Sequence, residues 1–105
     1  MSETLGRPIE AHAKVFHEVL LAFADGKVGN ADAEAKVFLA RLARIDETRP
    51  RIGRIIQHII LNRYEEAHPE ADVTAVDWTA VIEWLVENLP TILKMILSIL
   101  AIFGL

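Results

Sequence analysis

The apolar stretch at residues 91–105 constrains this chain more than any other feature, because eleven of its fifteen residues are apolar. At about 100° per residue, large apolar side chains cover nearly all of this helix except an arc of roughly 80°, which holds Thr91, Lys94, Ser98, Ala101 and Leu105. A helix with that surface cannot face water. We therefore expect it to pack into the chain's own core, against copies of the chain, against a partner or against a bilayer.

A transmembrane span is disfavoured by the length of this stretch. A spanning helix needs about 20 apolar residues, whereas fifteen residues rise only about 22 Å. Extending the stretch backward takes in Pro90, Asn88 and Glu87. The first ten residues carry neither the basic nor the apolar region of a secretory signal. We expect synthesis in the cytoplasm, without a signal peptide, and a final location in an assembly or at a membrane surface.

The rest of the chain has helical apolar spacing without strand alternation, so the predicted fold class is all-α. We expect a small bundle of about five helices with a highly apolar C-terminal helix after a proline break. The predicted organisation is a helical bundle over residues 1–89, followed by the apolar helix over 90–105. This last helix either belongs to the same domain or forms a contact segment for assembly or membrane binding.

Two helices are predicted before residue 50, at about 8–25 and about 31–47. The glycine-containing turn at 25–30 separates them, and Asn30 is a suitable N-cap for the second. The predicted inward residues are Ile9, Ala13, Phe16, Leu20 and Phe23, then Ala35, Phe38, Leu42 and Ile45.

A third helix is predicted from Pro50 to about Ala67, because proline suits a first helical turn. Its inward stripe is Ile52, Ile55, Ile56, Ile59 and Ile60. Gly53 interrupts this stripe, and a residue without a side chain permits the close approach of a neighbouring helix.

A fourth helix is predicted at about 75–88, with an N-terminal box beginning at Thr74. Its inward residues are Trp78, Ile82, Leu85 and Leu89. Pro90 then stops or kinks the chain before the terminal helix.

Charge is unevenly distributed along the sequence. Residues 36–54 include six basic and two acidic residues, a net of +4, whereas residues 65–87 include seven acidic residues and no Lys or Arg. Patches of opposite charge can pair within one molecule or orient neighbouring molecules head to tail.

The basic segment contains the candidate contacts for a polyanion or an acidic partner: Arg41, Arg44, Arg49, Arg51 and Arg54. Guanidinium groups bind phosphates through paired donors. However, no aromatic residue is interleaved with these arginines, and the chain has a net charge of −4. This composition disfavours nucleic acid as a partner and favours a solvated face or salt bridges to the acidic segment.

No catalytic or metal-binding pattern is complete in this sequence. Glu65 and His68 have the Glu-x-x-His spacing of di-iron helical proteins, but neither His12 nor His17 has a Glu three residues before it. Cysteine is absent. We therefore expect no enzyme, no catalytic or metal-binding residue, no cofactor and no small-molecule substrate.

The role favoured by the sequence is a structural or assembly protein that self-associates or docks into a larger complex through the terminal helix. The residues expected to make this contact are Trp84, Ile92, Leu93, Met95, Ile96, Leu97, Ile99, Leu100, Ile102 and Phe103. The alternative is peripheral membrane binding through the same helix, although Lys94 is its single basic residue. A third interpretation makes this helix the central core helix of a monomeric bundle.

Small acidic helical chains that end in a proline-broken apolar helix resemble minor components encoded by bacterial viruses. The resemblance implies a role in assembly, as a minor virion component, or in membrane contact.

Overall fold

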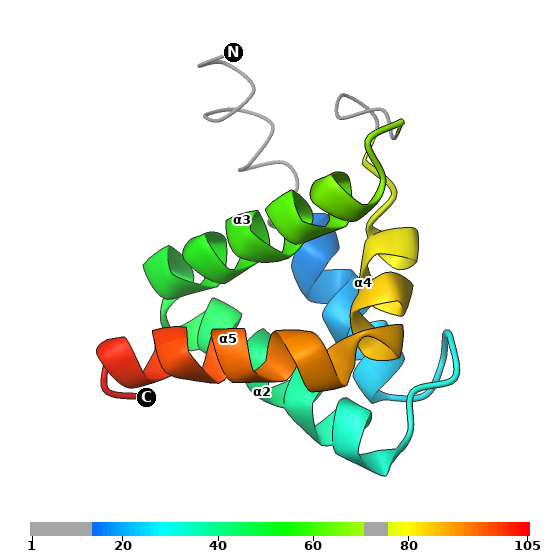
Figure 1. Ribbon diagram of the computed structural model, residues 1–105. Helices are drawn as coiled ribbons and strands as arrows, with labels where there is room; N and C mark the ends of the chain where they lie inside the picture. The colour runs from blue at the N-terminus through cyan, green and yellow to red at the C-terminus, as the bar shows by residue number, and fades with distance from the viewer. Residues whose placement is uncertain (1–13, 71–75) are drawn as a thin grey trace.

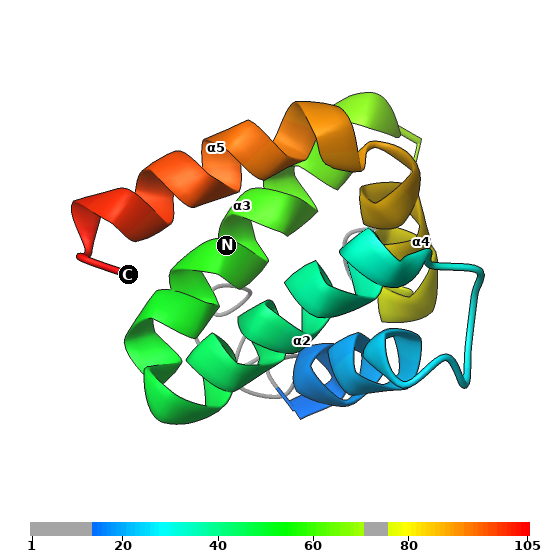
Figure 2. The same cartoon turned by 90° about the horizontal axis from the view of Figure 1, so that it is seen from below.

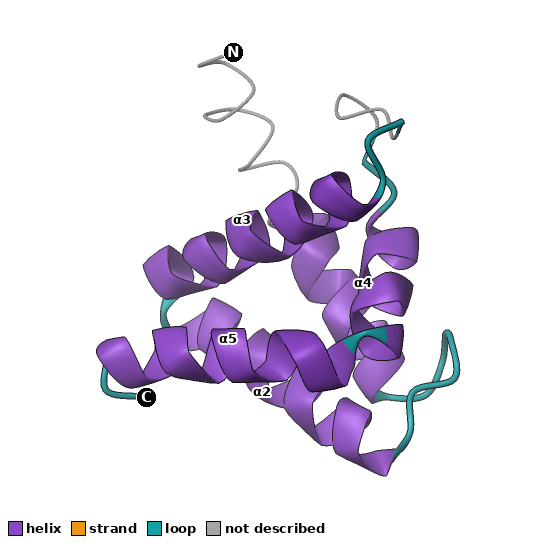
Figure 3. Cartoon of the chain, in the orientation of Figure 1, coloured by secondary structure: helices purple, strands orange, loops and turns teal. Residues whose placement is uncertain are grey.

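The computed structural model describes residues 14–70 and 76–105. Within these ranges it contains helices and no strand (Figure 3). A first helix occupies residues 14–24 and is followed by α2 (Ala33–Thr48), α3 (Pro50–Ala67), α4 (Trp78–Glu87) and α5 (Leu89–Ile102). The radius of gyration of 12.9 Å is the value expected for a compact domain of this length. The all-helical fold with five helices is therefore confirmed.

The helices surround one core, to which every helix contributes (Figures 1 and 2). The predicted inward residues that are buried include Phe16, Leu20 and Phe23 from the first helix, Ala35, Phe38, Leu42 and Ile45 from α2, and Trp78, Ile82 and Leu85 from α4. Trp78 packs edge-on against Phe16, with ring centroids 5.2 Å apart. Ile9 and Ala13 lie outside the described residues.

The predicted stripe of α3 is only partly correct. Ile56 and Ile60 are buried, and Ile52 and Ile59 are partly buried, but Ile55 is exposed. The five isoleucines have the spacing of a single stripe, but the buried face of α3 is centred on Gly53, Ile56 and Ile60 and leaves Ile55 at the far edge of that stripe. The buried face of α3 also includes Gln57, which the sequence did not indicate.

Two predicted helix starts are placed differently by the structure. Asp32, rather than Asn30, caps α2, because its Oδ1 accepts a hydrogen bond from the Ala35 amide at 2.8 Å. Helix α4 begins at Trp78 rather than at 75, and Asp77 is its N-cap. The predicted cap at Thr74 lies outside the described residues.

Helices α2 and α3 lie close together at Gly53, as the sequence predicted. A Cβ atom added at Gly53 would lie only 2.7 Å from the Cα of Asp46 on α2. Ordinary contact between carbon atoms requires about 3.5–4.0 Å. Glycine at this position therefore sets the distance between the two helices.

Helices α4 and α5 meet at a bend of 100°. The interruption lies at Asn88, whose side-chain amide donates to the Trp84 carbonyl at 2.9 Å and ends α4. The Asn88 carbonyl accepts from the amides of Thr91 and Ile92 and so begins α5. Pro90 was predicted to stop or kink the chain, but it lies in the first turn of α5, where its missing N–H removes no helical hydrogen bond. The bend turns α5 back across the bundle (Figure 1).

Candidate interaction surface

The structure divides the predicted contact residues into three groups. The first is buried in the chain's own core and comprises Ile92, Ile96 and Leu100. The second is partly buried and comprises Trp84, Leu93, Met95 and Ile99. The third is exposed and comprises Leu97, Ile102 and Phe103. One stripe of α5 therefore belongs to the bundle core, and the outer side of the helix retains apolar side chains for another contact.

The most exposed of these side chains lie at the end of α5, and we call Ile102 and Phe103 the apolar tip. Ile102 is 79% exposed and Phe103 is 43% exposed. After them the chain turns at Gly104, and Leu105 packs back against the core. The Leu105 amide donates to the Leu100 carbonyl at 2.9 Å, and the Leu105 carbonyl accepts from Nη2 of Arg41 at 3.3 Å. These contacts fix the turn and leave the apolar tip facing outward.

The five candidate arginines are all exposed and come from one region of the fold. Arg41 and Arg44 are on α2, Arg49 lies between the two helices, and Arg51 and Arg54 begin α3. The α2–α3 connection and the C-terminal end of α5 lie at the left of both Figure 1 and Figure 2. The apolar tip and the arginines therefore share one end of the molecule, which we call the basic end.

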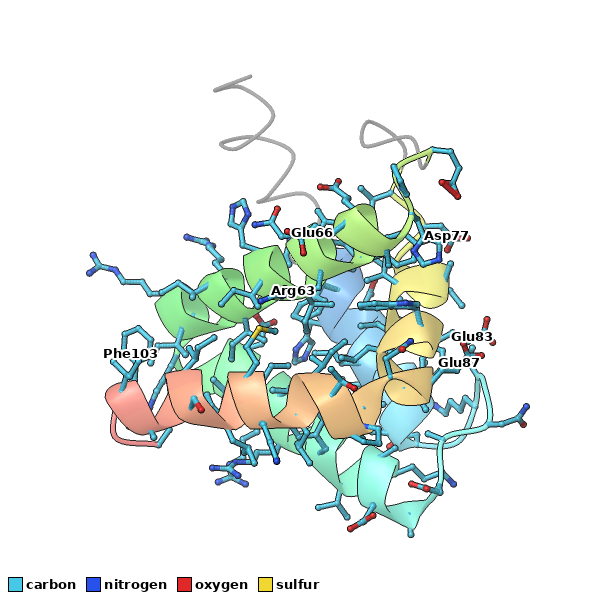
Figure 4. The ribbon with its side chains drawn as sticks, viewed as in Figure 1. Arg63, Glu66, Asp77, Glu83, Glu87 and Phe103 are labelled. Carbon is cyan, nitrogen blue, oxygen red and sulfur yellow. The ribbon has the colours of Figure 1, made fainter. Side chains whose placement is uncertain are left out.

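Helix α4 lies at the opposite end of the molecule, which carries acidic side chains. Asp77, Glu83 and Glu87 are all exposed. Figure 4 shows these three carboxylates at the right, with Phe103 at the far left. We call the surface of α4 that bears them the acidic end. Glu83 and Glu87 therefore belong to the solvated face of α4.

A groove lies beside α4 where α3, α4 and α5 meet, and we call it the tryptophan groove. Its volume is about 500 Å³, and it is lined by Arg63, Glu66 and Ala67 of α3, Trp84 of α4, and Thr91, Ile92 and Met95 of α5. Arg63 and Glu66 form an exposed ion pair with an N–O distance of 3.3 Å. An apolar ligand group entering the groove would therefore meet Trp84 and Met95 beside a neutralised pair of charges.

Aromatic packing holds Trp84 in place at the wall of this groove. The ring of Tyr64 lies edge-on to Trp84, with centroids 5.8 Å apart. His68 stacks on Tyr64 at 4.2 Å and also lies edge-on to Trp84 at 6.1 Å. Trp84 was predicted as a contact residue, but its packing with Tyr64 and His68 was not predicted. The spacing of four residues between Tyr64 and His68 on one helix was the available signal.

A second groove lies on the outer side of α2, and we call it the arginine groove. It has a volume of about 680 Å³ and is lined by Leu21, Val37, Ala40, Arg41, Ala43, Arg44, Glu47 and Thr48. Val37 is 71% exposed. Sequence reasoning missed this groove, although Val37 falls outside the predicted inward stripe of its helix. Arg41 and Arg44 give the groove the charge of the basic end.

Asp46 and His17 form the closest contact between titratable side chains of α2 and the first helix. Their Oδ2 and Nδ1 atoms are 3.3 Å apart, and the Asp46 side chain is only 10% exposed. Burial raises the pKa of Asp46, while the nearby charges of His17 and Arg54 act in the opposite direction. The burial of the charged carboxylate is the larger effect, and the pair lies within the packing of the bundle rather than in either groove.

The Glu65-x-x-His68 spacing is not part of a metal-ligand cluster in the described residues. His68 caps the end of α3, and its Nδ1 lies 2.9 Å from the Tyr64 carbonyl oxygen. Among residues 14–70 and 76–105, no three His, Asp or Glu side chains are grouped to hold a metal ion.

No single helix in the described part of the chain has the length and apolar character needed to cross a membrane. Helices α4 and α5 reach the required length and composition only as a pair, and that pair is sharply bent.

Comparison with protein families, curated proteins and solved structures gives no match for this chain.

Proposed function

We propose that this chain is a non-enzymatic structural protein that self-associates, or docks into a larger assembly, through the outer side of α5. The observation that carries the proposal is the exposure of the apolar tip at the basic end of the molecule. Exposed apolar side chains that adjoin charged residues are typical of protein contacts. The acidic surface at the opposite end gives a second copy of the chain a complementary charge.

The apolar tip alone does not supply enough free energy for a stable contact. Complete burial of one large apolar side chain is worth about 1.5–3 kcal/mol, so the exposed fractions of Ile102 and Phe103 offer about 2–4 kcal/mol together. Association costs about 4–15 kcal/mol in lost translational and rotational freedom. The contact must therefore add further apolar area, such as Leu97, and favourable charge pairing.

The experiment that tests this proposal compares Ile102→Asn with Val37→Asn. Both side chains are highly exposed, at 79% and 71%, so neither substitution removes core packing. We expect light scattering coupled to size exclusion to give a multiple of the 11.8 kDa chain mass for the wild type and for Val37→Asn. Ile102→Asn should shift the population toward the monomer. Equal masses for both variants, or a monomeric wild type, would contradict the proposal.

Peripheral membrane binding is the second candidate, and one specific observation favours it. The exposed Ile102 and Phe103 share an end of the molecule with five exposed arginines, a combination that suits the surface of an anionic bilayer. This function requires the full-length chain to float with vesicles containing phosphatidylserine and not with purely zwitterionic vesicles. Absence of binding to both vesicle types would exclude it.

A further inference from the structure

The apolar tip and the tryptophan groove are complementary surfaces that one molecule cannot bring together. Met95 in the groove and Phe103 in the tip are eight residues apart along α5, which corresponds to about 12 Å of helix. The tip is also held outward by the turn through Leu105 and its contact with Arg41. A tip can therefore enter a tryptophan groove only if the groove belongs to another molecule.

Charge favours this pairing between copies. The tip lies at the basic end, and the groove contains Trp84 of α4, the helix that also exposes Glu83 and Glu87. Arg63, the basic residue that lines the groove, is paired with Glu66 at 3.3 Å. The basic end that bears the tip and the acidic end beside the groove carry opposite charges, which orient the approach and disfavour the reversed arrangement.

The tryptophan groove also suits an apolar side chain by its construction. Trp84 is supported from behind by Tyr64 and His68, so its ring is fixed before binding occurs. Fixed aromatic side chains in a concave site are common centres of binding energy at protein contacts. Pre-organisation of this kind reduces the entropy lost when the contact forms.

We propose that Ile102 and Phe103 of one copy enter the tryptophan groove of a second copy in a head-to-tail contact. This inference rests on the proposed self-association and specifies its two surfaces. A contact between two different surfaces leaves a free tip on one molecule and a free groove on the other. Repetition of this contact continues the assembly into a ring or a filament, whereas two copies that make it reciprocally close a symmetric dimer.

The arginine groove is the competing site for the tip on a second copy. It offers a larger volume and the exposed Val37, but Arg41 and Arg44 line it. Two basic surfaces would then face each other, which is unfavourable for association. The tip is therefore assigned to the tryptophan groove.

Site-specific cross-linking tests this assignment, and the absence of native cysteine makes the test specific. Ala67 lines the tryptophan groove, Ala40 lines the arginine groove, and Ala101 adjoins the tip. All three side chains are exposed, so each can carry a reactive thiol. Full-length Ala67→Cys, Ala101→Cys and Ala40→Cys chains are mixed in pairs, treated with a short bismaleimide and separated on a denaturing gel. The Ala67→Cys plus Ala101→Cys mixture should give a several-fold higher yield of cross-linked dimer than any single variant or the Ala40→Cys plus Ala101→Cys mixture.

Each other outcome overturns the assignment in a recognisable way. Dominant cross-linking of Ala101→Cys with itself would indicate a symmetric tip-to-tip contact, and dominance of the Ala40→Cys mixture would move the tip to the arginine groove. No cross-link in a chain that scatters as a multimer would refute the head-to-tail contact and leave self-association standing. No cross-link in a monomeric chain would refute both proposals, and vesicle binding by that monomer would favour the membrane function.

Discussion

Gly53 provides a sharp test of how the bundle is packed, through the substitution Gly53→Ala. The added methyl group would lie 2.7 Å from the Cα of Asp46, about 1 Å closer than ordinary contact permits. The obstructing atom belongs to the backbone of α2, so it cannot move aside by a change of rotamer. Helices α2 and α3 must therefore separate, and the contact between Asp46 and His17 must move with them.

The size of the effect follows from two opposing contributions. Overpacking a core position costs about 1–3 kcal/mol, and a backbone obstruction belongs at the upper end of that range. Alanine in place of glycine inside a helix stabilises the folded chain by about 1 kcal/mol through its higher helix propensity. We expect Gly53→Ala to lower the free energy of unfolding by about 1–2 kcal/mol and the melting temperature by about 5–15 °C.

Urea unfolding followed by far-ultraviolet circular dichroism measures this change. Asn62→Ala is the matched control, because Asn62 is exposed on the same helix and the substitution changes helix propensity without adding to the core. The control should be slightly more stable than the wild type. A Gly53→Ala chain as stable as the control would refute the close approach of the two helices.

Three further predictions concern single side chains. Asp46→Asn tests the buried carboxylate. Burial raises the pKa of Asp46, so the folded chain binds a proton at a pH where the unfolded chain does not. The free energy of unfolding of the wild type should therefore rise relative to that of Asp46→Asn as the pH falls from about 6 to about 4. Urea unfolding at both pH values checks this, and a relative loss for the wild type would contradict it. Asp32→Ala removes the N-cap of α2 and should cost about 1 kcal/mol in thermal or urea unfolding, whereas Asp32→Asn should be nearly neutral. Gln57→Met should raise the free energy of unfolding by about 1 kcal/mol, because the buried Oε1 of Gln57 has no hydrogen-bond partner among the described residues. Urea unfolding measures this change. A variant less stable than the wild type would show that the Gln57 side chain is hydrogen-bonded.

The helices could be predicted from the sequence because their signals are local. The predicted bounds of α3, from Pro50 to about Ala67, agree with the structure. They follow from a proline at the start of the helix and from the His68-Pro69 pair after its end. The apolar spacing of the first helix and of α2 identified their buried faces for the same reason, since residues three and four apart share one side of a helix.

The predictions of where helices begin were less accurate, because several residue types can act as the N-cap. Asn30 and Asp32 both make good N-caps, and both precede the apolar stripe of α2. The choice depends on the path of the preceding turn, in which Gly29 has a φ of 72° and packs against Phe23. N-cap preferences do not report the path of that turn, so they could not decide between Asn30 and Asp32.

The candidate site could be predicted only in part for a related reason. The apolar character of α5 is evident from the sequence, but which of its sides faces the core depends on the helices that surround it. Ile92, Ile96 and Leu100 turn inward, while Ile102 and Phe103 stay outside. The tryptophan groove combines α3, α4 and α5, so no local pattern could have assembled it.

Self-association of this chain would be visible in the molar mass of the unmodified full-length chain. Light scattering in detergent-free buffer would be recorded over a concentration series at about 0.05 M and about 1 M salt, where charge screening differs strongly. A head-to-tail contact between basic and acidic ends should give masses above 11.8 kDa that rise with concentration and fall at high salt. A constant mass of 11.8 kDa at every concentration and both salt levels would contradict self-association.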